Sequence, residues 1–139
     1  MTEAFVLDAS FALHWCFEDE TTDQTEAVLT TLQNQAAMAW VPGIWAHEVL
    51  NGLGKGVARG RVERQRAIVF WQEIRVLPVQ VIETPVDEKL LELALEHDLS
   101  VYDASYLTLA ISLSNLPIAT GDGKLQQAAL RKGIEVIKP

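Results

Sequence analysis

The sequence predicts a three-layer α/β/α sandwich built around a central, mostly parallel sheet. Short apolar segments of strand length alternate along the whole chain with segments of helical periodicity. The short segments lack the polar alternation of a half-exposed sheet, which indicates strands buried on both faces. No linker, repeat or low-complexity run divides the 139 residues, so we expect one domain that covers residues 1–139.

The first half of the chain contains two predicted strands and four predicted helices. The apolar runs at 4–7 and 39–41 are short enough for strands, and Pro42-Gly43 closes the second. Apolar spacing predicts helices at about 10–17, 44–57 and 62–74. A further helix is expected to begin after a cap at Thr21 or Thr22.

The second half repeats the alternation. Strands are expected at 79–82, 117–120 and 134–137, with helices at about 85–97, 103–113 and 124–132. Gly133 stands where a left-handed residue would end the last helix. Because parallel strands end at one edge of a sheet, a ligand site is expected beyond their carboxyl ends.

Composition excludes several classes of protein. With 49% apolar residues the chain can build a core, which excludes a disordered protein, and the single cysteine, Cys16, excludes a disulfide scaffold. Residues 1–4 carry no basic region, and Asp8, His14 and Glu18 interrupt the apolar run that follows. The sequence therefore predicts neither a secretory signal nor a membrane span, and a cytoplasmic location is expected.

Charge is unevenly distributed. The net charge of −8 argues against a protein that coats nucleic acid non-specifically. Residues 55–75, however, contain six bases and two acids, a local net charge of +4 that leaves −12 for the rest. This segment is compatible with a basic edge for RNA or a protein partner, and equally with the solvated face of a helix.

Four carboxylates occupy positions at or near strand ends. Asp8 directly follows the first strand, Asp103 follows Val101-Tyr102, and Asp122 follows the strand near Ile118. Glu48 lies one turn into the helix after the second strand. Taken singly, Asp103 is typical of a helix cap, Asp122 of a turn and Glu48 of a surface charge, whereas Asp8 has no routine structural use.

If the first strand is central, these acids converge in one crevice. At about 6 Å and an effective dielectric constant near 20, each pair of charges repels by about 3 kcal/mol. All pairs together would cost on the order of ten kcal/mol, comparable with the total stability of a domain, so protons or cations must neutralise the cluster. No Cys or His accompanies the acids, and an all-oxygen site selects Mg²⁺, with Mn²⁺ also possible.

Four segments carry a resemblance to a known family. They are VLDAS at 6–10, VPGIWAHEVLN at 41–51, VYDASYLTLA at 101–110 and ATGDGKL at 119–125. In this order they resemble the PIN-domain ribonucleases, and most closely the VapC toxins of bacterial toxin–antitoxin pairs.

The resemblance implies a Mg²⁺-dependent endoribonuclease that acts as a toxin on RNA such as tRNA or rRNA. It implies a catalytic quartet, a VapB-type antitoxin that silences the enzyme, and a homodimer. Asp8, Asp103 and Asp122 would hold the metal, and Glu48 would orient the attacking water. The supporting residues would be Ser10, Thr120 and, on the helix face of Glu48, Asn51.

Two other functions are considered beside the ribonuclease. A catalytically silent module of the same fold would bind a partner without binding Mg²⁺. A phosphatase of the haloacid-dehalogenase type needs a second Asp two residues after the first, where this chain has Ser10. The histidines and tryptophans are interpreted as surface or packing residues, namely His14, His47, His97, Trp15, Trp40, Trp45 and Trp71.

Overall fold

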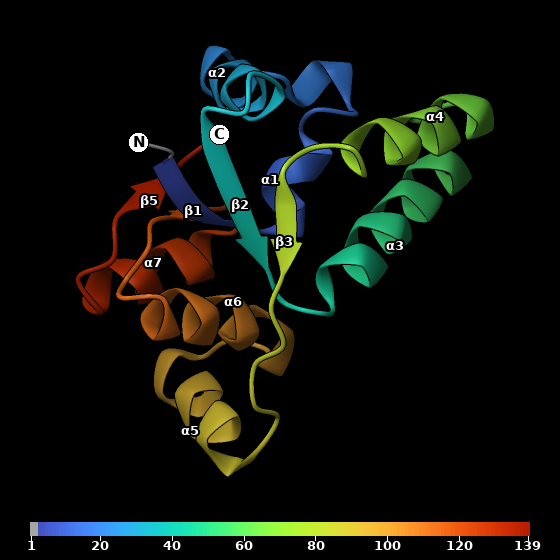
Figure 1. Cartoon of the computed structure of the whole chain (residues 1–139). Coiled ribbons are helices and arrows are strands. Elements are labelled where there is room, and N and C mark those ends of the chain that lie inside the picture. Colours follow the sequence, from blue (N-terminus) through green and yellow to red (C-terminus); the bar gives the residue numbers. More distant parts are fainter. Residues whose placement is uncertain (1–2) are drawn as a thin grey trace.

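A five-stranded parallel sheet forms the centre of the molecule, in the order β3-β2-β1-β4-β5 (Figure 1). The computed structural model describes residues 3–139, so Met1 and Thr2, at the start of the segment examined for a secretory signal, lie outside the described residues. The strands are β1 (Glu3–Leu7), β2 (Ala37–Val41), β3 (Val79–Val81), β4 (Ile118–Ala119) and β5 (Val136–Ile137).

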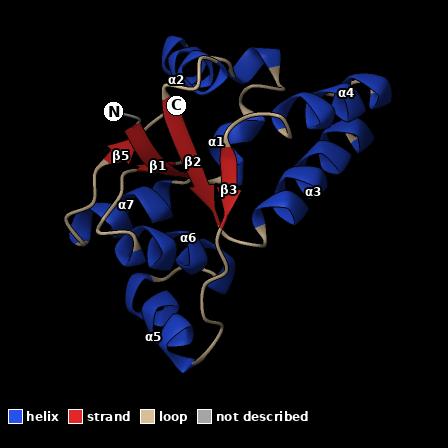
Figure 2. Cartoon of the chain, viewed as in Figure 1, coloured by secondary structure: helices blue, strands red, loops and turns tan. Residues whose placement is uncertain are grey.

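Helices cover both faces of this sheet, as the sandwich prediction requires. α5, α6 and α7 gather on one side, and α1, α3 and α4 lie on the other (Figure 2). The helices are α1 (Ala9–Leu13), the 3₁₀ turn η1 (Glu18–Glu20), α2 (Asp23–Gln33), α3 (Trp45–Ala58), α4 (Arg64–Ile74), α5 (Glu88–His97), α6 (Val101–Ser112) and α7 (Gly123–Arg131). Within residues 3–139, none of them has the length and apolar character that crossing a membrane requires.

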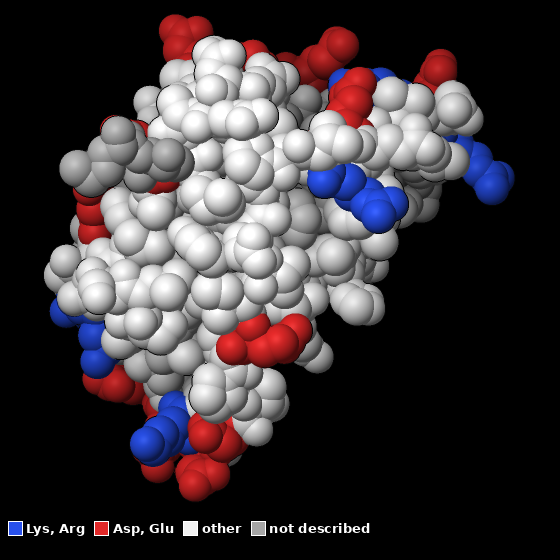
Figure 3. Space-filling model, in the orientation of Figure 1, with Lys and Arg blue, Asp and Glu red and all other residues white. Residues whose placement is uncertain are grey.

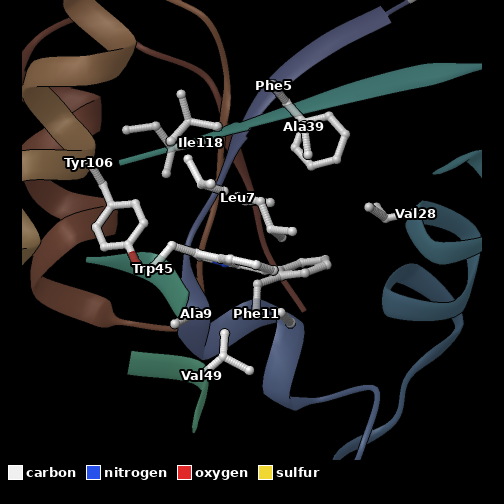
Figure 4. Packing of buried hydrophobic residues seen from close by; sticks show 14 of the residues in the cluster. Phe5, Leu7, Ala9, Phe11, Val28, Ala39, Trp45, Val49, Tyr106 and Ile118 are labelled. Carbon is white, nitrogen blue, oxygen red and sulfur yellow. The ribbon is translucent and has the colours of Figure 1, made fainter. Parts of the chain in front are cut away.

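β1 is the central strand because its side chains are apolar on both faces. Val6 pairs in register with Trp40 of β2 and with Ile118 of β4, and both Val6 and Leu7 are fully buried. Figure 4 shows Leu7 and Ile118 packed between Tyr106 of α6 on one side and Phe11 of α1 on the other. The carboxyl end of β1 is therefore fixed in the middle of the molecule.

One expectation at a functional position is wrong. Val101 and Tyr102 do not form a strand before Asp103; they are the first two residues of α6, and Ser100 caps that helix by accepting the Asp103 backbone N–H at 3.0 Å. The Ser100 side chain satisfies an amide that would otherwise lack a partner, so the helix begins earlier than predicted. Asp103 thus belongs to the first turn of α6 and is not its cap.

The other boundaries lie within a few residues of the expected ones. Thr22 caps α2 and exchanges hydrogen bonds with Thr25 in a capping box. Asp87 caps α5 through the Lys89 amide, which starts that helix later than the expected residue 85. Gly133 has φ +73° at the end of α7, as its position indicates.

Candidate active site

The Asp8 carboxylate lies at the carboxyl end of β1, beneath the surface. The backbone there continues the sheet, since the Asp8 N–H donates to the Ala119 carbonyl of β4 at 2.9 Å. Asp8 precedes α1, but its side chain does not cap that helix. With only 3% of the residue exposed, burial raises the pKa of Asp8.

Two hydroxyl groups hold this carboxylate. Ser10 Oγ donates to Asp8 Oδ2 at 2.6 Å, and Thr120 Oγ1 donates to the same oxygen at 2.7 Å. Each hydroxyl also accepts a backbone N–H of the loop before α7, Ser10 from Gly121 and Thr120 from Asp122, both at 3.0 Å. Ser10 and Thr120 thereby join the end of β1 to the loop that carries Asp122, and both lower the pKa of Asp8 against the effect of burial.

Asp103 and Asp122 meet beside Asp8. Asp122 caps α7 by accepting the Lys124 N–H on Oδ1 at 3.0 Å. The pKa of Asp103 is raised to about 7, first by burial, then by a hydrogen bond with the Asp122 carboxyl and by the charges of Asp122 and Asp8. Burial and the two neighbouring carboxyl groups therefore both disfavour the charged form of Asp103.

Glu48 reaches the crevice from the first turn of α3. Tyr106 of α6, which is fully buried, donates its O–H to Glu48 Oε1 at 2.6 Å. Burial raises the pKa of Glu48 and the charge of Asp8 raises it further, while the Tyr106 hydrogen bond lowers it. Sequence reasoning gave no role to Tyr106, because it follows Glu48 by 58 positions, a separation that leaves no local pattern to detect.

The last predicted supporting residue, Asn51, lies at the surface next to Glu48. Asn51 is exposed and lines a hollow on the surface with His47, Glu48 and Tyr102, and its side chain forms no hydrogen bond within residues 3–139. His97 is buried near α7, where the Arg131 side chain contacts it at 3.3 Å. Asn51 therefore lies beside Glu48 and, unlike Ser10 and Thr120, makes no hydrogen bond to Asp8.

The tryptophans are packing residues, as expected. Trp15 and Trp45 are buried in the core, and Trp40 and Trp71 pack against it from partly exposed positions. Cys16 is buried beside them as a small apolar side chain.

The donor chemistry of the cluster fits a hard divalent cation. Every side chain in it offers oxygen, and burial together with mutual repulsion raises the pKa values of Asp8, Glu48 and Asp103. In the part of the chain that the structure describes, no three His, Cys, Asp or Glu side chains already converge on one ion position. The carboxylates instead interact in pairs, Asp103 with Asp122 and Glu48 with Asp8.

A comparison with known protein families identifies the family to which this chain belongs. The family model for the PIN domain matches residues 5–130, a stretch that contains all four acids. The chain belongs to the PIN domain family. PIN domains are generally nucleases, and they typically use divalent metal ions. No curated protein matches the sequence.

Two solved structures share the fold of this PIN domain. The crystal structure of PAE2754 from Pyrobaculum aerophilum superposes with a TM-score of 0.74 at 24% identity, over 98% of this chain and 84% of the other. VapBC2 from Rickettsia felis, bound to a DNA fragment from its promoter, superposes with a TM-score of 0.65 at 13% identity, over 97% and 98%. At these identities the likeness concerns the fold.

Proposed function

We propose that this PIN domain is a Mg²⁺-dependent endoribonuclease. The observation that carries the proposal is that Asp103 and Asp122 meet beside the buried Asp8 carboxylate at the carboxyl end of β1. Carboxylates that repel each other in this way gain most when a divalent cation replaces the protons they would otherwise hold. Carboxylate-bound Mg²⁺ is also suited to substrates that contain phosphate.

Each acid has a role in the proposal. Asp8, Asp103 and Asp122 hold the metal, and Mn²⁺ can take the place of Mg²⁺. When bound, the ion supplies Lewis-acid stabilisation of the charge that develops on the phosphate. Glu48, oriented by the Tyr106 O–H, positions the attacking water and accepts its proton. Ser10 and Thr120 orient Asp8 and lower its pKa by donating to its Oδ2.

The biological role that we propose is the toxin of a VapBC-type pair. The four sequence segments resemble VapC toxins, and a VapBC complex from Rickettsia felis has the same fold. The partner would be a VapB-type antitoxin, the substrate an RNA such as tRNA or rRNA, and the toxin a homodimer. An apolar hollow between α3 and α4, where Leu50 and Ile68 are about half exposed, supports a protein partner.

Replacement of Asp8 tests the nuclease proposal. We expect Asp8→Asn to lower cleavage of a fluorogenic single-stranded RNA in Mg²⁺ by at least about 100-fold, because the neutral amide removes a metal ligand. Growth inhibition on expression should disappear with it. The matched control is Asp23→Asn in the exposed first turn of α2, which should keep full activity.

Circular dichroism establishes that the Asp8→Asn variant is folded. A folded Asp8→Asn protein that cleaves RNA at the wild-type rate would contradict the assignment. A wild-type protein that neither binds Mg²⁺ nor cleaves RNA would instead favour a catalytically silent binding module.

A further inference from the structure

A groove of about 290 Å³ runs between α1 and α3 beside the acidic cluster. Ser10, which holds Asp8, lines it together with His14, Lys55, Arg59 and Arg61. The groove connects to the Asp122 loop as well, because a Cβ on Gly121 would lie 3.1 Å from His14 Nε2. The groove therefore begins where the candidate catalytic residues are.

Two glycines of α3 set the direction of the groove. A Cβ on Gly52 would lie 2.4 Å from Leu13, and one on Gly56 would lie 2.7 Å from the Phe17 ring. These close contacts align α3 with the segment that continues from α1, so that Gly52 faces Leu13 and Gly56 faces Phe17. The groove thus follows α3 away from Glu48 and toward Arg59.

Lys55 and Arg59 lie on the α3 face that borders this groove. They follow Glu48 by seven and eleven residues, which places them about 10 Å and about 16 Å along the helix from it. Both side chains are exposed, and neither forms an ion pair or a side-chain hydrogen bond within residues 3–139. Two cations without partners therefore stand in line with the acidic cluster.

Arg61 differs from these two bases. Its guanidinium contacts Asp19 at 3.1 Å and Glu20 at 3.4 Å, and it lies 4.3 Å from the centre of the Phe17 ring. These contacts fix the turn after α3 against η1. Arg61 compensates the carboxylates beside it, and Lys55 and Arg59 remain available for a ligand.

From this arrangement we infer that the α1–α3 groove binds the backbone of single-stranded RNA next to the bond that is cleaved. Lys55 and Arg59 contact successive phosphates, and the strand reaches the acidic cluster over Ser10 and His14. The inference rests on the proposed nuclease function. A nucleic-acid strand is favoured over an acidic peptide because the groove opens into the site where the phosphodiester must lie.

The inference explains how an acidic protein can bind a polyanion. The basic segment 55–75 divides in the structure: Lys55, Arg59 and Arg61 border the groove, whereas Arg64 lines the apolar hollow and Arg66 pairs with Glu73 at 3.3 Å. Of the described residues, Glu20 is the one acid in the groove's lining and it pairs with Arg61, so the groove keeps an excess of positive charge at one edge of a chain whose net charge is −8.

The test is RNA binding by the full chain in EDTA, where no cleavage occurs. A labelled single-stranded RNA of about ten nucleotides is titrated by fluorescence anisotropy at several salt concentrations. Lys55→Ala with Arg59→Ala should weaken binding on the order of tenfold at low salt. The plot of the logarithm of the association constant against the logarithm of the salt concentration should become less steep. Its slope should decrease in magnitude by about 1.4, since each phosphate contact on a single strand contributes about 0.7.

The matched control is Lys89→Ala with Arg75→Ala, which removes the same charge from exposed positions outside the groove. The control should leave the slope unchanged and the affinity within about twofold. Equal weakening in both double variants, or none in either, overturns the inference. So does a groove variant that binds RNA normally and instead loses binding to a hexaglutamate peptide, which would assign the groove to an acidic protein segment.

Failure of the groove inference can be distinguished from failure of the proposed nuclease function. Wild-type protein that fails to cleave RNA in Mg²⁺ contradicts the nuclease proposal whatever the groove does. Wild-type protein that cleaves RNA, combined with unchanged binding by the Lys55→Ala, Arg59→Ala variant, contradicts the groove alone.

Discussion

Two hydroxyl groups favour the charged form of the Asp8 carboxylate against the effect of burial. Ser10 and Thr120 each have one proton, and both donate it to Asp8 Oδ2. Hydrogen bonds from hydroxyl groups are stronger to a charged carboxylate than to a neutral carboxyl, so this network lowers the pKa of Asp8, whereas burial raises it. The network leaves Oδ1 of Asp8 as the oxygen not engaged by these hydroxyls.

Thr120→Val tests how much this network contributes. Valine fills the same space but removes the donor to Asp8 and the acceptor of the Asp122 N–H at a fully buried position. We expect the free energy of unfolding to fall by about 1–3 kcal/mol in chemical denaturation, the cost of leaving buried polar groups unpaired. Thr108→Val is the control, because the Thr108 hydroxyl forms no hydrogen bond within the described residues, and its change should stay within about 0.5 kcal/mol. Equal effects of the two substitutions would contradict the network.

The pKa of Asp103 predicts how stability depends on pH. Asp103 titrates near pH 7 in the folded protein and near 4 in the unfolded chain, so between these values the folded state holds more protons. Stability of the metal-free protein should therefore fall as the pH rises from about 4 to about 7. Asp8 and Glu48, whose pKa values are also raised, act in the same direction.

Urea denaturation in EDTA at pH 5 and pH 7.5 measures this dependence. Asp103→Asn cannot ionise and should lose less stability between the two pH values than the wild type does. Identical pH dependence in the two proteins would show that Asp103 titrates normally.

Some site residues were predictable from the sequence and others were not. Asp8 could be identified because a carboxylate directly after a buried strand has no common structural use, and the structure places it at the carboxyl end of β1. The Tyr106–Glu48 hydrogen bond depends on how α6 packs against α3, which no spacing along the chain encodes. Asn51 shares a surface hollow with Glu48, as the helical spacing predicts, and it forms no hydrogen bond with Asp8.

At the scale of elements, α6 shows where pattern reasoning failed. The apolar pair before Asp103 suggested a strand, but Ser100 stands three residues before an acid, a spacing typical of a helix start. The spacing from Ser100 to Asp103 therefore predicts a helix start at Ser100, and this capping signal decides the local structure against the strand preference of the two apolar residues that follow Ser100. The other helices and the five strands lie within a few residues of their predicted positions, because their apolar periodicity is long or their caps are clear.

We expect replacement by alanine to have opposite effects on stability at two glycines of α3. Gly54 is exposed and a Cβ there would contact nothing within 4 Å, so Gly54→Ala should raise the free energy of unfolding by about 0.5–1 kcal/mol through helix propensity. Gly56 is buried against the Phe17 ring, so Gly56→Ala should lower it despite the same gain in propensity. Chemical denaturation of the two variants measures both changes. A stabilised Gly56→Ala protein would mean that α1 and α3 are not held in close contact.

At the scale of the whole molecule, the sheet topology gathers charges that are distant in the sequence. β1 is flanked by β2 and β4, so the segments after these three strands share one edge of the sheet, and α6 packs close enough to add Asp103. Elsewhere the charges are mixed: Figure 3 shows basic and acidic side chains together both at the α3–α4 side and near α5. The acidic crevice is therefore a consequence of the fold and not of the overall composition.

Calorimetric titration with Mg²⁺ and Mn²⁺ tests the central claim, that the four carboxylates form a divalent cation site. We expect saturable binding to the wild-type protein near neutral pH, accompanied by a rise in Tm. In folded Asp8→Asn protein the affinity should be lower by at least about tenfold, and in the exposed control Asp23→Asn it should be unchanged. Absence of binding to the wild type, or equal binding to folded Asp8→Asn, would contradict the claim.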